Sequence, residues 1–600
     1  MPAARIFKLA TVYTEDEIAS VRYEQTADVM LFSHLDHPIQ RLRRFAHNDW
    51  RMDDMPVGSQ VAIPTGVAVV ATNPQSSDPD YVGQVYAYAV TAVSDGRESQ
   101  ASVTLTVTND LALKGDYNDV LVTPVAGIDE YRVYSVRSGV YGYVGSIIPP
   151  ETIFKDDNIS ADFSSGPPRN TNPFESGENP AAVTFHDARS VFARTPHAPN
   201  AVHTSRTDDI LNFDKSRPAQ ATDAISVGLR GRRVNAVQHL LSLGDLLAFT
   251  NDGLFALVPT TDNVLSPTSI QSKAQGYSGA GICRPEIVDD VAFYTPGGND
   301  AIRTLGYTLD RDGYRGNDVT VFARHFFARY KITHMAWCKK PSSMLVCRRS
   351  DGKLIVLTWQ AEQDVWGWTP WDTDGEVESI CPVSEDGNDV LYAIVRRTVG
   401  GVLKRNMERL TYPHWMDQDW SEPEKAVIMD SAVIYEGEPA SNFSRLFHLE
   451  GRDVAVLADG YVIPDRSVVN GVLTPPLDFE ASRVAIGLPY EAFLKTLPVV
   501  VQGQQGTTKG RPSAATSVIV EAMNTAGIEY GIGTAIGEIF DMPAPFEVVS
   551  TQDGPIPLFT GLYDSLGMPP GKWQEAQVLI RQRRPLPMCI LGIMPDIEVS

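Results

Sequence analysis

The stretch from Arg22 to Phe45, RYEQTADVMLFSHLDHPIQRLRRF, gathers the side chains best suited to chemistry. The histidines His34 and His37, the aspartates Asp28 and Asp36 and four arginines surround one apolar run. Imidazole and carboxylate groups could bind a metal or move protons, but a zinc site needs three or four ligands. No third His or Cys lies nearby, so we predict that both histidines are structural. We assign no catalytic, cofactor-binding or metal-binding residue and expect no cofactor.

Two Asp-x-Asp-Gly segments resemble parts of calcium loops, namely LDRDGYRGND (309–318) and WDTDGEVE (371–378). An EF-hand loop places its glycine at the sixth position and closes with a bidentate Glu, and neither segment does so. Asp-Gly is also the preferred pair in tight hairpin turns. We therefore predict turns at both segments rather than metal sites.

A propeller glycosidase would need paired carboxylates, and the candidates nearest to such a site are Asp351, Asp364 and Asp372. Three tryptophans, Trp366, Trp368 and Trp371, could stack on sugar rings, although in a strand such residues more often belong to a core or an interface. GxSxG, HExxH, Walker A and a post-strand GxGxxG are absent. The sequence therefore gives no support for catalysis, and we predict that the protein is not an enzyme.

The chain is acidic, with a net charge of −23 over 600 residues, which disfavours a protein that wraps DNA or RNA. Its short basic groups are RLRR (41–44), GLRGRR (228–233) and RQRR (581–584). We interpret them as solvated strand faces or subunit contacts. No apolar run is long enough for a transmembrane helix, and the N-terminal sequence does not resemble a secretory signal. The five cysteines contain no CxxC and are predicted to be free thiols.

Short strands and tight turns dominate the pattern of the chain. Ser-Gly, Asp-Gly and Asn-Gly pairs predict turns between strands at 138–139, 386–387, 459–460, 470–471 and 553–554, among others. Thr14 and Glu17 have capping-box spacing and predict a short helix, followed by a buried strand in DVMLFSH (28–34). Alternating β-branched and aromatic residues predict a β-sandwich over 64–163, similar to a fibronectin type III domain but without its core tryptophan. A Pro/Gly/Ser/Asn linker (164–180) precedes strands over 181–424 and 425–600. These strands are compatible with a sandwich stack, a barrel or a propeller, because no sequence repeat of regular length distinguishes among the three folds.

The N-terminal stretch RIFKLATVYTEDEIASVRYEQTADVMLFSHLDHPIQRLRRF (5–45) resembles a signature of phage tail nozzle proteins, the tail tubular protein B type. Matching positions are Thr11, Tyr13, Gln25, Ala27, Asp28, Val29, His34, Asp36, His37 and Pro38, whereas Val12, Leu35 and Ile39 depart from it. The likeness continues in order through 178–193, 208–213, 223–257, 267–270, 312–327, 351–368 and 583–599.

The resemblance implies a mainly β fold, a β-propeller with an inserted fibronectin type III-like sandwich (64–163) and a C-terminal β region (425–600) that completes the propeller or hub. The N-terminal segment 1–63 would join the propeller, whose main region is 181–424. The resemblance also implies that the protein is a structural component of the virion tail and is assembled in the bacterial cytoplasm. Family members carry a further stretch ahead of the signature, which we expect to be absent here or encoded separately.

The partners implied by the resemblance are other copies of the same chain in a ring of typically six, the head–tail adaptor, tail fibres or tailspikes, and the host envelope. Genome DNA would pass through the lumen without specific binding, because each phosphate met by Lys or Arg would add salt-sensitive affinity. Two alternatives stay open at this point. One is an adhesin or fibre-docking protein, and the other is a propeller glycosidase acting on host polysaccharide.

Overall fold

The computed structural model is mainly β and divides into two compact units, residues 1–332 and 333–600. It describes residues 7–231, 235–261, 264–410, 425, 427–498, 500, 502–503, 506–507, 509, 511–532, 558–567 and 577–599. Nearly all sheets are small and antiparallel, and the single α-helix in the described residues, α1 (Arg324–Phe327), has one turn. None of the helices described is long and apolar enough to span a bilayer.

The first unit begins with a short 3₁₀ turn, η1 (Ile18–Ser20), and a four-stranded meander. The expected helix is thus reduced to this turn, because a strand already starts at Arg22. The predicted buried strand is confirmed as β2, and a two-residue turn at Leu35–Asp36 sets His34 opposite His37. The strands are β1 (Arg22–Thr26), β2 (Val29–His34), β3 (His37–Ala46) and β4 (Asp49–Asp54).

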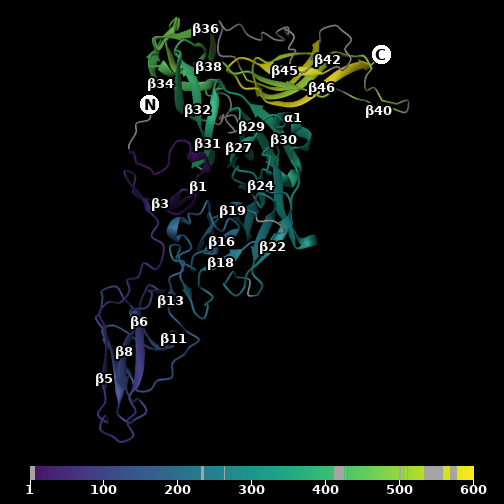
Figure 1. Ribbon diagram of the computed structural model, residues 1–600. Helices are drawn as coiled ribbons and strands as arrows, with labels where there is room; N and C mark the ends of the chain where they lie inside the picture. Colours follow the sequence, from purple (N-terminus) through teal and green to yellow (C-terminus); the bar gives the residue numbers. More distant parts are fainter. Residues whose placement is uncertain are drawn as a thin grey trace. The chain divides into compact units, whose positions relative to one another are not determined.

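A β-sandwich follows, built from two antiparallel sheets around Val90, Val120, Tyr131 and Val133. Its strands are purple to blue in Figure 1. The predicted Ser138-Gly139 turn joins two strands with φ values of 51° and 77°, as a two-residue hairpin requires. One sheet contains β6 (Gln84–Ser94), β7 (Arg97–Glu98), β8 (Leu105–Asn109), β10 (Glu130–Arg137) and β11 (Val140–Ile147), and the other β5 (Val67–Thr72), β9 (Tyr117–Val122) and β12 (Ile153–Asp156).

Three successive four-stranded antiparallel sheets complete the first unit, and this repeated sheet is the blade of a β-propeller. Adjacent blades pack through apolar side chains, for example Val191 and Val202 against Leu240 and Leu246. The short pair β13 (Pro168–Arg169) and β17 (Lys215–Ser216) lies outside the blades. The blades are β14 (Ala182–His186), β15 (Arg189–Ala193), β16 (Ala201–Thr204), β18 (Ile225–Gly228); β19 (Val237–Leu243), β20 (Asp245–Thr250), β21 (Leu254–Val258), β22 (Gln271–Gly276); and β23 (Glu286–Val288), β24 (Val291–Tyr294), β25 (Arg303–Thr308), β26 (Gly313–Arg315).

The second unit opens with a further four-stranded sheet and a three-stranded one, packed through Val346, Val356, Ile380 and Val395. The predicted turn Asp386-Gly387 is a hairpin with positive φ at both residues. The strands are β27 (Ile332–Cys338), β28 (Met344–Arg349), β29 (Leu354–Gln360), β30 (Val365–Trp371), β31 (Glu376–Glu385), β32 (Asn388–Val399) and β33 (Val402–Arg409).

The C-terminal region is also β, as expected. Predicted turns at 459–460 and 470–471 again join hairpin strands. The turn predicted at 553–554 and the region boundary predicted at 424 lie outside the described residues. The strands are β34 (Asp430–Ala440), β35 (Asp453–Ala458), β36 (Tyr461–Val469), β37 (Val472–Thr474), β38 (Ala481–Leu488), β39 (Ala492–Lys495), β40 (Gln502–Gly503), β41 (Gly506–Thr507), β42 (Ser513–Thr525), β43 (Glu529–Ile532), β44 (Phe559–Gly567), β45 (Val578–Gln582) and β46 (Ile590–Val599). The predicted fold class, a mainly β propeller with an inserted sandwich and a C-terminal β region, is therefore confirmed.

Candidate functional site

A cluster of Glu17, His34 and His37 forms where the segment before β1 meets the β2–β3 hairpin. One ligand-type atom of each residue lies within 4.8 Å of the others. Glu17 Oε1 is 3.1 Å from His37 Nε2, and the two imidazole centroids are 5.2 Å apart. In the described part of the chain this is the one group of three or more His, Cys, Asp or Glu that meets such a limit. The cluster therefore brings together three groups that can act as metal ligands.

Neighbouring polar groups fix the cluster. The Thr14 backbone N–H and hydroxyl both donate to Glu17 Oε2, at 2.8 and 2.9 Å. These hydrogen bonds, with the contact to His37, lower the pKa of Glu17 to about 2. His34 is buried, its Nε2 is 2.8 Å from Ser20 Oγ, and its Nδ1 is 3.2 Å from the Asp36 N–H nitrogen. The predicted capping-box contact thus exists, but it positions a carboxylate beside two histidines.

Tyr13, another signature residue, covers this cluster. Its ring meets the His37 ring edge-on at a centroid distance of 5.4 Å. Burial, with the nearby charges of Asp54 and Glu17, raises the pKa of Tyr13 to about 12. The Tyr13 hydroxyl is shielded from solvent and has no hydrogen-bond partner among the described residues. The same holds for His37 Nε2, whose close approach to Glu17 lacks hydrogen-bond geometry.

The basic groups have acidic partners in their own chain. Arg41 and Arg43 converge on Asp53 at 2.7 and 3.0 Å, and Arg44 Nε is 2.9 Å from Asp28 Oδ1. In RQRR, the two arginines at 581 and 583 both bind Glu529, each at 2.7 Å. Of GLRGRR, the arginines at 232 and 233 lie outside the described residues. Most arginines of the described groups thus form intrachain ion pairs on strand faces, with Arg41 and Arg43 sharing one carboxylate and Arg581 and Arg583 sharing another.

A small cavity of about 270 Å³ lies beside β1 and the three blades of the first unit. Glu24 and the signature residue Gln25 line it together with Arg284 and Glu286, and apolar side chains such as Leu241 complete its wall. Arg284 Nη2 binds Glu24 Oε2 at 2.9 Å, and burial raises the pKa of Glu286 to about 7. The cavity contains one matched ion pair and one carboxyl group that is easily protonated.

Two of the three carboxylates considered for a glycosidase bind cations of the same chain. Asp351 Oδ2 is 2.5 Å from Arg349 Nη2, and its pKa is lowered because hydrogen bonds and charge from Arg349 outweigh burial. Asp372 binds Lys353, and Asp364 ends a 3₁₀ turn with φ 53°. A glycosidase acid needs a raised pKa. The lowered pKa of Asp351 does not suit that role.

The two Asp-x-Asp-Gly segments form turns, as predicted. Asp312 ends a 3₁₀ turn with φ 46° and accepts a hydrogen bond from the Tyr307 hydroxyl at 2.7 Å. Asp374 precedes Gly375, whose φ is 140°, and binds Arg452. Their carboxylates therefore bind side chains of the chain itself rather than converging on one point.

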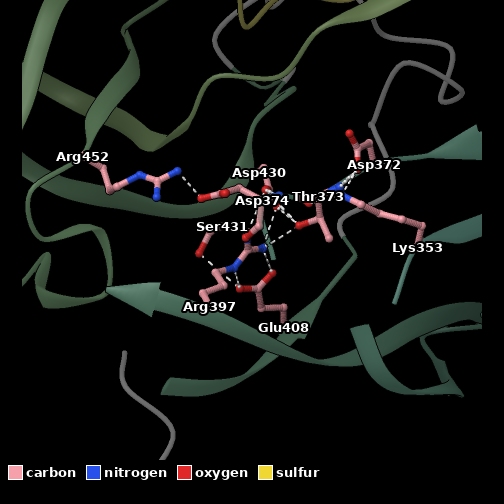
Figure 2. A network of polar contacts seen from close by, with 9 residues as sticks. All are labelled: Lys353, Asp372, Thr373, Asp374, Arg397, Glu408, Asp430, Ser431 and Arg452. Atoms are coloured by element: carbon pink, nitrogen blue, oxygen red, sulfur yellow. Dashed lines mark hydrogen bonds and ion pairs between the residues drawn. The ribbon is translucent and has the colours of Figure 1, made fainter. Parts of the chain in front are cut away.

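An extensive polar network of the second unit centres on Arg397, which is 3% exposed. Figure 2 shows its guanidinium between two carboxylates. Its Nε and Nη2 bind both oxygens of Glu408 at 2.9 and 2.7 Å, and Nη2 and Nη1 bind Asp430 at 2.8 and 3.0 Å. Burial would lower the pKa of Arg397, but these two carboxylates outweigh it and raise that pKa. With Thr373 also bound at 2.8 Å, the cation is saturated and serves structure.

The tryptophan cluster lies on β29 and β30. Trp366 is 41% exposed and its ring centroid is 6.5 Å from that of Trp359, whereas Trp371 packs against the apolar core. The interpretation as core or interface residues fits Trp371, and Trp366 presents an aromatic surface. The five cysteines are free, as predicted, and those at 283, 338 and 347 are buried.

Comparison with known proteins gives only remote likenesses. No protein-family model and no curated protein matches the chain. Among solved structures, it is similar to a Lactobacillus plantarum protein from a structural genomics programme, with 12% identity and a TM-score of 0.24, covering 55% of this chain and 96% of that one. It is also similar to a periplasmic gluconolactonase from Pseudomonas aeruginosa, with 12% identity and a TM-score of 0.25, covering 55% and 100%. At these scores neither match informs function.

Proposed function

We propose that this protein is a structural subunit of a phage tail, one copy of a ring-shaped nozzle or hub below the head–tail adaptor through which genome DNA leaves. The observation that carries the proposal is the signature in residues 5–45 together with matching segments, in order, as far as residue 599. Each segment is short, and their order along most of the chain makes the set specific.

The structural roles of the signature residues support an architectural function. Asp28 binds Arg44, Glu17 binds Thr14, and Asp36 occupies the two-residue turn between β2 and β3. Most of these polar groups bind other groups of the same chain and hold a sheet in register. Such intrachain polar contacts are expected in a protein whose function requires a rigid structure.

The charge distribution supports a conduit that DNA passes without being held. The net charge is −23, and five of the six arginines in the groups at 41–44 and 581–584 form ion pairs with Asp53, Asp28 or Glu529. Arginines paired with carboxylates on an acidic chain attract phosphates less strongly. A closed ring of identical subunits would use a heterologous interface, in which one face of a subunit meets a different face of its neighbour.

A titration of the purified protein with duplex DNA at physiological salt tests this mechanism. We expect affinity weaker than about 10⁻⁴–10⁻⁶ M, the range of ordinary non-specific binders. Fluorescence anisotropy of a labelled duplex gives the measurement. Micromolar binding with a steep salt dependence would show that Lys and Arg line the DNA path and would end the passive-conduit mechanism.

An adhesin or fibre-docking role is the second candidate, and the exposed Trp366 beside Trp359 is the observation that favours it. Aromatic surfaces of this kind bind sugars or partner proteins. A glycan-array screen of wild type and Trp366→Ala separates the two, because a nozzle would bind no glycan. The glycosidase alternative has less support, because Asp351 and Asp372 are held by cations.

A further inference from the structure

We propose that Glu17, His34 and His37 form a binding site for a zinc-type divalent transition metal. The sequence predicts no such site, since it offers only two histidines in a hairpin turn. The fold adds the third ligand by placing the Glu17 carboxylate 3.1 Å from His37 Nε2. Two imidazoles and one carboxylate are a known zinc ligand set with one position left open. This inference does not depend on the proposed tail function.

Two of the three ligands are oriented by neighbouring groups. Thr14 holds Glu17 Oε2 through two hydrogen bonds and leaves Oε1 facing His37. The Asp36 backbone N–H donates to His34 Nδ1 at 3.2 Å, and Ser20 Oγ lies 2.8 Å from His34 Nε2. Such contacts of the second ring nitrogen fix the orientation of a metal-binding imidazole.

A second observation also points to a ligand here. His37 Nε2 and the Tyr13 hydroxyl are shielded from solvent, and neither makes a well-aligned hydrogen bond to a described residue. The Glu17 carboxylate lies 3.1 Å from His37 Nε2 without hydrogen-bond geometry. A shielded polar group without a hydrogen bond is destabilising. A metal bound to both His37 Nε2 and Glu17 Oε1 would replace this poorly aligned contact with two coordinate bonds.

A metal here would fasten the N-terminal segment to the β2–β3 hairpin. The 3₁₀ turn Ile18–Ser20 contains no buried residue, so apolar packing contributes little to holding it. The link would join Glu17, ahead of β1, to residues on either side of the hairpin turn. The chemical role inferred is therefore structural, as in sites where binding free energy becomes folding free energy.

The test uses the full-length chain, stripped with a chelator and then titrated with Zn²⁺ or Co²⁺. We expect one equivalent of zinc after gel filtration, measured by elemental analysis, and visible Co²⁺ bands of low coordination number. Glu17→Gln and His37→Gln should lose stoichiometric binding. Asp16→Asn and His47→Gln, which change exposed residues of matching type, should bind like wild type.

Circular dichroism of the metal-free variants shows whether a variant that fails to bind metal is still folded. The Co²⁺ spectrum of wild type tests for the site without any substitution. The proposal is overturned if wild type takes up less than stoichiometric zinc and gives only the spectrum of hydrated Co²⁺. It is also overturned if His37→Gln retains wild-type affinity, because the metal would then be held by other residues.

Discussion

Replacing Arg397 with methionine should destabilise the second unit severely. Arg397 is 3% exposed and joins Glu408 on β33 to Asp430 at the start of β34, while it also binds Thr373. Methionine fills similar volume but leaves two partly buried carboxylates uncompensated. Breaking a buried ion pair by removing one partner costs about 3–5 kcal/mol.

The neighbouring residue provides a matched control. Arg396 binds Glu376 and lies 3.6 Å from Glu378, but its side chain is one-third exposed. Exposed ion pairs contribute about 0–1 kcal/mol, so Arg396→Met should change stability little. Arg397→Lys should restore only part of the loss, because an ammonium group cannot bind both Glu408 oxygens in a bidentate fashion.

Urea unfolding followed by tryptophan fluorescence measures the effect, since urea does not screen ion pairs as guanidinium does. Eight of the nine tryptophans lie between residues 337 and 573, so the signal reports mainly on the second unit. With a slope of about 3 kcal/mol/M, a loss of 3–5 kcal/mol lowers the midpoint by about 1–1.7 M. Equal midpoints for Arg397→Met and Arg396→Met would refute the assigned role of the network.

Three further outcomes are expected. Burial lowers the pKa of His239 to about 3, so below about pH 6.5 the unfolded chain binds a proton that the folded chain does not. The free energy of unfolding should therefore decrease as the pH is lowered from 6.5 to 3, by up to about 1.4 kcal/mol per pH unit. The variant His239→Gln should show a weaker dependence on pH. Residues 64–163 expressed alone should give a β circular-dichroism spectrum and melt cooperatively, and a disordered spectrum would contradict an autonomous sandwich. Gly279→Ala should lower the melting temperature, because its Cβ would lie 2.0 Å from the Asn251 carbonyl oxygen, whereas Gly276→Ala meets nothing within 4 Å and should not.

The turns and strands were predictable because their signals are local. Ser138-Gly139 and Asp386-Gly387 require positive φ, and the chain reverses at both. The alternation in the sandwich strands likewise follows from one face being buried. Propeller blades were harder to infer, since their strands vary in length and spacing. The helix expected after Thr14 fails because the strand β1 starts at Arg22 and leaves room for one turn.

The polar clusters were not predictable, because strand pairing assembles them. The spacing from Thr14 predicts that Glu17 is a capping residue. The pairing of β2 with β3 is what brings His34 and His37 together beside it. Arg397 and Asp430 are 33 positions apart and belong to different sheets. The resemblance to nozzle proteins points to the signature as a whole without saying which of its side chains touch.

Single-particle electron microscopy of the full-length protein, alone and with phage head–tail adaptor rings, tests the central proposal most directly. A nozzle subunit should assemble into a closed ring with an open central channel and should stack coaxially on the adaptor. A protein that stays monomeric under both conditions, or that binds at the periphery of the adaptor without surrounding its channel, would contradict the proposal that this chain forms the conduit for the genome.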